Sequence, residues 1–328
     1  MSRSSFNASA PGNVFFFGEF AVIYNKPCVI ASVDRRTTVS VSLRSDDKVA
    51  VDSAAFGRAS AVLDKRLGSY EGKATELYPV LDFLGDIASK LGVDSGFDLS
   101  IKSDVPVNSG MSSSTAVFCS ILKAVSAMAG REIDNKDYFD WIYPHQVKIH
   151  GGKASGSEIV SSSVGGFNMV RKTDKGVKFD SLGEHKFSVV IGDTMVSAPT
   201  SLTVGYHLPS MEKRFPRMVS GIFNSIEKLA LDAREPIQCE DIDEIGRMMN
   251  ENQKLLVQLG MSHPKLDDCI NAAIDAGAAG AKLSGGGWGG IMVALCYPKD
   301  QNKVMKGIAE TGANVIKTEI GVAGARSE

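Results

Sequence analysis

A run of small residues from Pro106 to Ala116, Pro-Val-Asn-Ser-Gly-Met-Ser-Ser-Ser-Thr-Ala, has the composition of a phosphate-binding loop. Glycine and serine add little bulk, so backbone N–H groups can converge on one anion, and a following helix adds the positive end of its dipole. The hydroxyl groups can also contact a metal ion. The run is not a Walker A loop, because no Gly-Lys-Ser/Thr follows. An ordinary helix capped by serine is the alternative interpretation.

A second run, Lys282 to Gly290, contains five glycines in the six positions 285–290 and leads into the apolar segment 291–295. Glycine loses more conformational freedom on folding than other residues, so such a run is unfavourable for stability by itself. This cost indicates a backbone that passes close to a bound ligand. A wide turn at the surface is the alternative interpretation.

Two carboxylates lie in sequence contexts that suit a site. Glu19 belongs to the segment Gly12 to Phe20, which is otherwise mostly apolar. A buried carboxylate needs a partner or serves a site. Glu158 follows the stretch Gly151 to Ser157, which contains three glycines, and is a candidate general acid or base. For Glu158 taken alone, an ordinary surface carboxylate is the alternative.

These segments need a scaffold, and the spacing of apolar residues predicts one. Alternation predicts strands at 37–43 and 97–102, while helical spacing predicts helices at 77–91 and 113–129, the second a buried helix that ends at Gly130. Further along, the pattern predicts a strand at 187–191, helices at 211–233, 241–259 and 265–277, and strands at 290–296 and 314–319. Strands and helices follow one another without regular alternation, which favours an α+β fold.

Composition narrows the class of protein. The 328 residues include 36 Lys and Arg and 38 Asp and Glu, so the net charge is −2 and offers no general footprint for nucleic acid or an anionic membrane. The five cysteines have no metal-ligand spacing and suit reduced thiols. No apolar stretch reaches the roughly 18 residues of a membrane span. Since the start also lacks the apolar core of a signal peptide, we expect a cytoplasmic protein.

The three loops, taken in order, resemble the motifs of the GHMP kinase superfamily. Pro11 to Val14 with Gly18 to Phe20 resembles its first motif, Pro106 to Ala116 its phosphate loop and Lys282 to Gly290 its third motif. The archaeal mevalonate kinase-like branch is the most similar, through the segments 191–194, 198–200, 248–253 and 276–283. The resemblance implies a two-domain GHMP kinase fold. A ribosomal protein S5 domain 2-like, ATP-binding domain would span 1–178, and a ferredoxin-like C-terminal domain 179–328.

The resemblance also implies roles for single residues, with ATP and Mg²⁺ as cofactors. ATP would be bound by Asn108, Ser109, Gly110, Met111, Ser112, Ser113, Ser114 and Thr115. Catalysis would involve Glu158, Asn13 and Ser114, and the metal would be held by Ser114 and by Gln146, which stands near the family's magnesium-binding Glu. The substrate would be lined by Glu19, Phe20, Lys153, Ser155, Thr200, Gly285, Gly286 and Gly287.

Besides Gln146, five positions depart from the family pattern. Asn13 stands where the family usually has Lys, and Phe20 where mevalonate kinases have His. Asn108 and Ser112 replace glycines of the phosphate loop, and Glu158 replaces the catalytic Asp. Since glutamate is one methylene longer than aspartate, Glu158 either accepts the proton of the attacking hydroxyl or only orients that hydroxyl.

The implied activity is that of an ATP-dependent kinase of the mevalonate pathway, which phosphorylates the 5-hydroxyl of a mevalonate-type acid. Lys153, Arg35 and Arg36 suit an acceptor that already carries phosphate, so mevalonate 3-phosphate is preferred over free mevalonate. Cations that are merely solvated are the alternative interpretation of these three residues.

Two further functions stay open. A phosphomevalonate decarboxylase-type enzyme of the same fold would release carbon dioxide, and a non-catalytic homologue would bind nucleotide without turnover. The expected partner is a small-molecule substrate, with neither nucleic acid nor membrane. Because the family is often dimeric, a homodimer is one candidate assembly.

Overall fold

The computed structural model describes residues 5–63, 70–107, 110–149, 154–196, 199 and 202–328. Its strands are β1 (Ser5–Phe17), β2 (Cys28–Leu43), β3 (Lys48–Ser53), β4 (Gly57–Val62), β5 (Tyr70–Glu71), β6 (Phe97–Ser103), β7 (Phe167–Thr173), β8 (Gly176–Gly183), β9 (Phe187–Asp193), β10 (Gly280–Ser284), β11 (Ile291–Leu295), β12 (Asn314–Ile320) and β13 (Arg326–Ser327). Its α-helices are α1 (Tyr78–Leu91), α2 (Ser113–Met128), α3 (Tyr138–Ile149), α4 (Ser157–Val164), α6 (Leu208–Arg214), α7 (Pro216–Asp232), α8 (Arg234–Gln238), α9 (Ile242–Gln258), α10 (Pro264–Asp275) and α11 (Gln301–Ala309).

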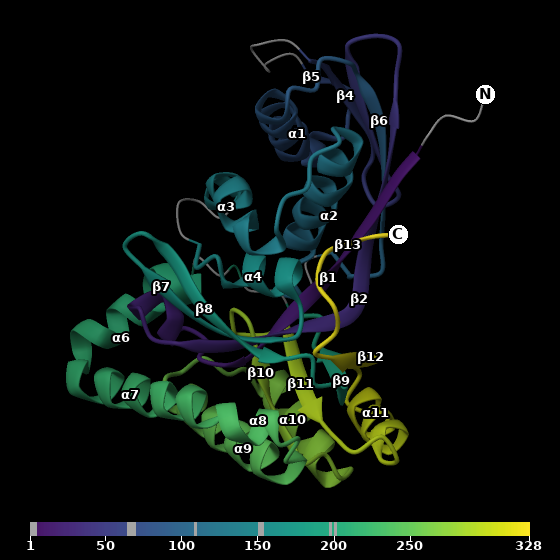
Figure 1. The fold of residues 1–328 in the computed structure, drawn as a ribbon. Coiled ribbons are helices and arrows are strands. Elements are labelled where there is room, and N and C mark those ends of the chain that lie inside the picture. Colours follow the sequence, from purple (N-terminus) through teal and green to yellow (C-terminus); the bar gives the residue numbers. More distant parts are fainter. Residues whose placement is uncertain (1–4, 64–69, 108–109, 150–153, 197–198, 200–201) are drawn as a thin grey trace.

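The two long strands β1 and β2 join an N-terminal part and a C-terminal part of the molecule (Figure 1). The sheet runs in the order β10-β11-β9-β12-β2-β6-β3-β4-β5, and β1 and β7 both pair with β2. Strand β1 is antiparallel to β2 along nearly its whole length. It also contacts α2 and α4 from the N-terminal part and β10 from the C-terminal part. The residues of β1 therefore lie where the two parts meet.

In the N-terminal part, α1 and α2 cover one face of the sheet β2-β6-β3-β4-β5. Helix α2 buries residues on more than one face, among them Phe118, Ile121, Leu122 and Val125, so the predicted buried helix is confirmed. Its end is also as predicted, since Gly130 follows with φ of +64°, a conformation that suits glycine at a helix terminus.

In the C-terminal part, β10 is an edge strand, and α9 lies along that edge. Asn250 Oδ1 accepts a hydrogen bond from Ala281 N–H at 3.0 Å, and Gln253 Oε1 accepts one from Leu283 N–H at 2.9 Å. These side chains accept hydrogen bonds from backbone N–H groups of β10 that a further strand would otherwise accept, so the edge of the sheet is covered. The strand that leads into the glycine run is thereby held in place.

The predicted elements compare well with the structure. The strands predicted at 97–102 and 314–319 are β6 and β12, and the helices predicted at 77–91 and 241–259 are α1 and α9. The helix predicted at 211–233 is wrong as a single element, because Pro216 separates α6 from α7 and cannot continue a preceding helix. Mixed order without regular alternation confirms the α+β class.

The C-terminal tail returns to the N-terminal part. Ser327 pairs with Ala8 in β1, and Ala323 bridges to Gly165 just after α4. The boundary predicted between residues 178 and 179 falls inside β8. The division into 1–178 and 179–328 stays a prediction.

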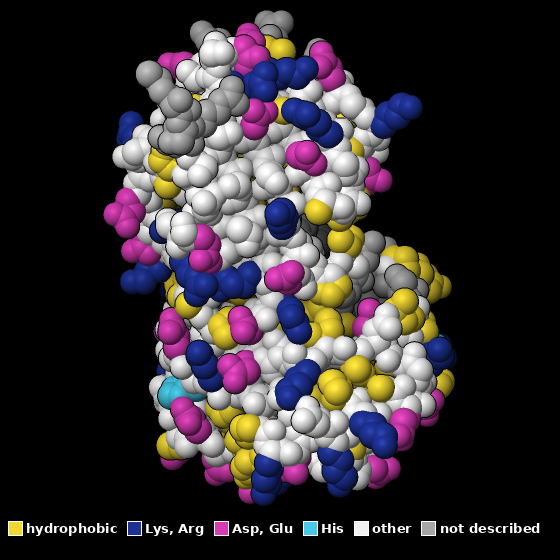
Figure 2. Space-filling model, turned by 90° about the vertical axis from the view of Figure 1, so that its right-hand side faces the viewer, with side chains coloured by type: hydrophobic (Ala, Val, Ile, Leu, Met, Phe, Trp, Pro, Cys, Tyr) yellow, Lys and Arg dark blue, Asp and Glu magenta, His cyan; other side chains and the backbone are white. Residues whose placement is uncertain are grey.

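The surface carries both signs of charge interspersed over the face shown in Figure 2, in keeping with a net charge of −2. Among the described residues, every helix is too short or too polar to cross a membrane.

Candidate active site

The N-terminus of α2 is free of side-chain caps in the described part of the chain. Ser112, at the N-cap position, has φ of +56° and gives no capping hydrogen bond. Its hydroxyl instead donates to Asn13 Oδ1 at 2.8 Å. The amides of Ser113, Ser114 and Thr115 precede the first helical hydrogen bond, from Ala116 N–H to the Ser112 carbonyl. This end of a long helix can therefore bind an anion through unpaired N–H groups and the helix dipole.

The described end of the phosphate loop lies directly against the glycine run. A Cβ placed on Gly110 would stand 3.5 Å from Ile291 Cγ1, and one on Gly285 would stand 3.8 Å from the Gly110 carbonyl oxygen. Met111 is buried in the core, so only its backbone faces the loop, and its carbonyl accepts from Asn13 N–H at 3.1 Å. The two segments that the sequence singled out thus lie directly against each other.

The glycine run is fixed by close backbone contacts and is not a loose surface turn. A Cβ on Gly287 would lie 2.4 Å from the Met261 carbonyl oxygen, and one on Gly289 would lie 2.3 Å from that of Val196. Both residues have positive φ. Trp288 anchors the run by donating its backbone N–H to Met261 at 2.9 Å. Glycine is required at Gly287 and Gly289 because the chain's own backbone passes so close. A close approach of the run to a bound ligand stays a prediction.

Glu158 lies in the first turn of α4, which begins after Gly156 with φ of +78°. The Ser155 hydroxyl donates to Glu158 Oε2 at 3.0 Å and lies 2.6 Å from the Ser157 hydroxyl. The hydrogen bond from Ser155 orients the Glu158 carboxylate. Because Glu158 is only half-buried, its side chain is still accessible from solvent. An oriented carboxylate of this kind can accept or direct a proton.

Glu19 has a partner that the sequence did not predict. It forms an ion pair with Lys282, and both side chains are fully buried, at 1% and 0% exposure. Lys282 Nζ also donates to the Leu283 carbonyl at 2.7 Å. Burial lowers the pKa of Lys282, and the charge of Glu19 opposes that effect. The first and third motifs are therefore joined by a buried charge pair, and Glu19 Oε2 has no hydrogen-bond partner among the described residues.

One buried thiol, that of Cys28, is within electrostatic reach of the carboxylates of both Glu158 and Glu19. Burial raises the pKa of Cys28, and the charges of Glu158 and Glu19 raise it further, against a hydrogen bond from Ser157. Both carboxylates thus belong to one region of the molecule. The thiol itself is inert, since a protonated, buried cysteine is a poor nucleophile.

Phe20 and two arginines make contacts within the protein that the sequence did not predict. The Phe20 ring is buried in the hydrophobic cluster of the C-terminal part, so it contributes packing. Arg36 donates to the Ala323 and Gly324 carbonyls at 2.8 and 2.7 Å, and burial lowers its pKa to about 10. Arg35 donates to the Lys317 carbonyl at 3.1 Å. All three guanidinium nitrogens of Arg36 bond to the protein itself, so the expectation that Arg36 binds a substrate phosphate is wrong. For Arg35 the same expectation stays a prediction.

Gln146 lies beside the start of α2, and its side-chain amide oxygen could serve as one ligand of a metal ion. Its Nε2 donates to Thr115 Oγ1 at 2.8 Å, while its buried Oε1 has no partner in the described residues. An orphaned amide oxygen and the Ser114 hydroxyl match the oxygen ligands that Mg²⁺ prefers. Across the described ranges, no group of three or more His, Cys, Asp or Glu side chains could hold a metal. Phosphate oxygens and water would therefore have to supply most of the coordination.

Four residues of the predicted site lie outside the described residues: Asn108, Ser109, Lys153 and Thr200. Residues Asn13 to Phe15 of β1 contact the described end of the phosphate loop, the first turn of α4 and the strand that leads into the glycine run, whereas the Phe20 ring packs in the C-terminal core. Gly286 lies within the glycine run between Gly285 and Gly287, and Ser155 with Glu158 opens α4.

Comparison with known proteins now identifies the family. Residues 78–166 match the GHMP kinases N terminal domain, and residues 228–314 match GHMP kinases C terminal. The chain is 31% identical to a mevalonate kinase of Thermococcus sibiricus and 30% identical to one of Pyrococcus furiosus, over 98% of each chain in both cases. The chain belongs to the GHMP kinase family. It is an ATP-dependent phosphotransferase that acts on an alcohol group, as the three motifs predicted.

Solved structures agree with this fold. Mevalonate kinase of L. major, crystallised in complex with R-mevalonate, matches with a TM-score of 0.83 and 20% identity over 98% of both chains. Streptococcus pneumoniae phosphomevalonate kinase, in complex with phosphomevalonate and AMPPNP, matches with a TM-score of 0.75 and 16% identity over 95% of this chain and 99% of that one. The GHMP kinase fold predicted from the motifs is confirmed.

Sequence reasoning missed several residues of this GHMP kinase site. The sequence marks Lys282 only as the start of the glycine run, and Ser162 and Ser284 carry no signal. Ser284 Oγ accepts from Phe15 N–H at 2.9 Å and lies 3.2 Å from the Phe15 carbonyl, so it fastens the glycine run to β1. These partners are far apart in the chain, and no local pattern points to them.

Proposed function

We propose that this GHMP kinase transfers the γ-phosphoryl group of ATP to the primary 5-hydroxyl of a mevalonate-type acid. One observation carries the proposal: the uncapped N-terminus of α2 faces the glycine run, and the helix that bears Glu158 is fastened beside it. The mevalonate kinases among its relatives support the choice of acceptor class.

The chemistry asks mainly for positioning and stabilisation of charge. The amides of Ser113 to Thr115 would hold the β- and γ-phosphates, and the glycine run would bring its backbone close to the acceptor. Glu158, oriented by Ser155, would accept the proton of the attacking hydroxyl or orient that hydroxyl. Ser114 and Gln146 would contact Mg²⁺, which neutralises charge on the phosphates when it is bound.

For the acceptor, we propose mevalonate 3-phosphate. Two positions of the first motif are changed here. Phe20, where mevalonate kinases have His, is packed into the core, and the amide of Asn13, where the family usually has Lys, is bonded to neighbouring protein groups. Lys153 and Arg35 remain the cations proposed for the extra phosphate. Free mevalonate is the second candidate, because the relatives at 30–31% identity are named mevalonate kinases and Arg36 is engaged elsewhere.

The test is incubation of the purified protein with γ-labelled ATP, Mg²⁺ and each acceptor in turn. Turnover of mevalonate 3-phosphate at a kcat/KM well above that for free mevalonate supports the proposal. The reverse ranking makes the chain an ordinary mevalonate kinase. Carbon dioxide release would identify a decarboxylase, and nucleotide binding without turnover of any acceptor would identify a non-catalytic homologue.

The residue test is Glu158→Gln, compared with Glu158→Asp. If Glu158 handles the proton, the Gln variant lowers kcat by about 10²-fold or more, since a positioned general base contributes an effect of that order. The Asp variant keeps the charge and should retain more activity. An unchanged kcat in the Gln variant would remove Glu158 from the mechanism.

A further inference from the structure

Asn13 lies on β1 at the centre of the site, and its side chain is fully buried. Its Oδ1 accepts a hydrogen bond from the Ser112 hydroxyl at 2.8 Å. Its Nδ2 donates to the Glu158 carbonyl at 3.2 Å and to the Ser162 hydroxyl at 3.0 Å. One amide group thus connects the phosphate loop to two successive turns of α4.

The orientation of this amide is fixed by chemistry. A backbone carbonyl can only accept, so the nitrogen of Asn13 must face the Glu158 carbonyl and the oxygen must face Ser112. Both N–H donors of Asn13 are then in use, and its oxygen is occupied by Ser112. Asn13 has no donor left for a substrate or a phosphate, which argues against the direct catalytic role predicted for it from the motif.

Neither lysine nor aspartate at position 13 could make all of these contacts. Lysine has donors but no acceptor for the Ser112 hydroxyl, and aspartate has acceptors but no donor for the Glu158 carbonyl. The backbone of Asn13 adds a further bond, from its N–H to the Met111 carbonyl at 3.1 Å. Position 13 therefore holds the phosphate loop through both its main chain and its side chain.

We propose that Asn13 is a positioning residue that couples the phosphate loop to the helix carrying Glu158, so that nucleotide bound at α2 orders α4. This inference rests on the proposed function, because it assigns the loop to nucleotide and Glu158 to the acceptor. Buried hydrogen bonds in a site of low dielectric are suited to such coupling, since a lost partner leaves an unsatisfied group.

The experiment separates the two sides of the amide. Ser112→Ala removes the donor on the loop side, and Asn13→Asp keeps the acceptor for Ser112 but removes both donors to α4. Ser162→Ala removes one acceptor and leaves the Glu158 carbonyl bonded. Ser120→Ala is the matched control, because Ser120 is a buried serine of α2 whose hydroxyl donates, within the described part of the chain, to the Thr37 and Ala116 carbonyls and to no group of the site.

The readout is hydrogen exchange of the α4 amides, residues 157–164, with and without ADP, together with the ADP dissociation constant and steady-state kinetics. In the unmodified protein and in Ser120→Ala, ADP should slow exchange in α4. In Asn13→Asp this slowing should disappear and kcat should fall by about 10²-fold, the effect of a small misplacement of a reacting group. Ser112→Ala should weaken ADP binding by about fivefold, the equivalent of one hydrogen bond, and also remove the slowing.

The results distinguish failure of the coupling from failure of the proposed function. If no acceptor is phosphorylated, the proposed function fails, yet ADP binding and α4 exchange still test the coupling. The coupling is overturned if ADP leaves α4 exchange unchanged in the unmodified protein, or if Asn13→Asp and Ser112→Ala both retain the slowing seen in Ser120→Ala. If Asn13→Asp does not fold, Ser112→Ala and Ser162→Ala decide the same question, with the smaller loss expected for Ser162→Ala.

Discussion

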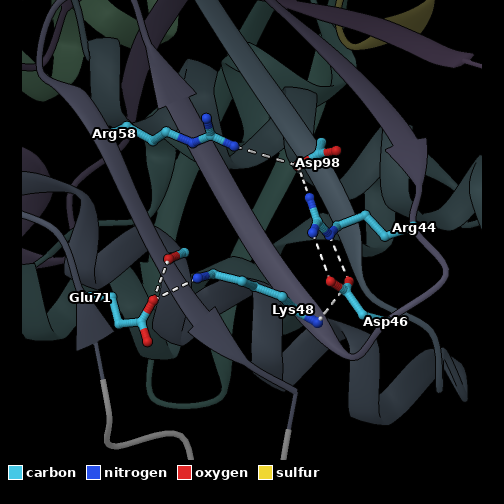
Figure 3. A network of polar contacts seen from close by, with 7 residues as sticks. Arg44, Asp46, Lys48, Arg58, Glu71 and Asp98 are labelled. Atoms are coloured by element: carbon cyan, nitrogen blue, oxygen red, sulfur yellow. Dashed lines mark hydrogen bonds and ion pairs between the residues drawn. The ribbon is translucent and has the colours of Figure 1, made fainter.

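Two networks of charged side chains in this protein differ in burial: one is exposed to solvent and the other is fully buried. On the outer face of the N-terminal sheet, Arg44 bridges Asp46 and Asp98, and Lys48 reaches Glu71 on β5 (Figure 3). Their side chains are 25% to 67% exposed, so each charge keeps part of its hydration. At the site, Lys282 and Glu19 are 0% and 1% exposed and depend on each other.

The comparison shows why a polar contact cannot be judged by its distance alone. An exposed ion pair gains little because water already stabilises both charges. A buried pair has given up its water, so removal of one partner leaves a charge with no compensation. We therefore expect the outer network to tolerate change and the site network to resist it.

The largest effect should come from Lys282→Met, which leaves Glu19 buried and unpaired. We expect a loss of about 3–5 kcal/mol in the free energy of unfolding, measured by denaturant titration. The double variant Lys282→Met with Glu19→Met should recover most of that loss, because no buried charge remains. A double variant as unstable as the single one would show that the pair is not the cause.

A smaller loss in the free energy of unfolding is expected from Gly287→Ala in the glycine run. Gly57→Ala, at the start of β4 in the N-terminal part, is its control. Both glycines have positive φ, which costs alanine about 1–2 kcal/mol. Only at Gly287 would the new Cβ meet backbone, 2.4 Å from the Met261 carbonyl, whereas at Gly57 nothing lies within 4 Å. Overpacking adds about 1–3 kcal/mol, so Gly287→Ala should be the less stable variant.

The same pair of variants separates stability from activity. Gly287→Ala should raise the KM for the acceptor, since the run must shift to relieve the overlap, while Gly57→Ala should leave the kinetics unchanged. Equal stability and equal kinetics in both variants would mean that the glycine run is not held as tightly as its backbone contacts indicate.

The sequence predicted what depends on local pattern. Strong periodicity placed the helix at 113–129, and glycine density found the run at 285–290, because both signals lie within a few neighbouring residues. The role of Asn13 could not be predicted in this way, since the three groups that its side chain bonds lie 99, 145 and 149 residues away in the sequence. Such partners are set by the topology, which packs β1 against both α2 and α4.

Side-chain type alone also misplaced some residues. Arg36 follows the first motif closely in sequence, which suggested a substrate cation, but it holds the returning C-terminal tail. Lys282 precedes the glycines and gave no sign that it would be fully buried, because a lysine is buried only where a partner is supplied from elsewhere. In both cases the deciding partner is distant in the chain.

The smallest effect is expected from Arg44→Ala in the outer network. The Arg44 guanidinium lowers the pKa of Asp46 to about 2, so the bond contributes stability above the ordinary pKa of the carboxyl and loses it as the pH falls toward 2. At pH 7 the variant should melt only about 2–3 °C lower, since exposed pairs contribute little. The difference from the unmodified protein should shrink between about pH 4 and pH 2, because the protonated Asp46 no longer distinguishes the two proteins. Thermal melts of both proteins across that pH range, repeated in high salt, measure this difference in melting temperature.

A large, pH-independent loss in melting temperature would mean that Arg44 stabilises the sheet by packing of its alkyl chain. The contrast between the two networks would then not rest on hydration of charge.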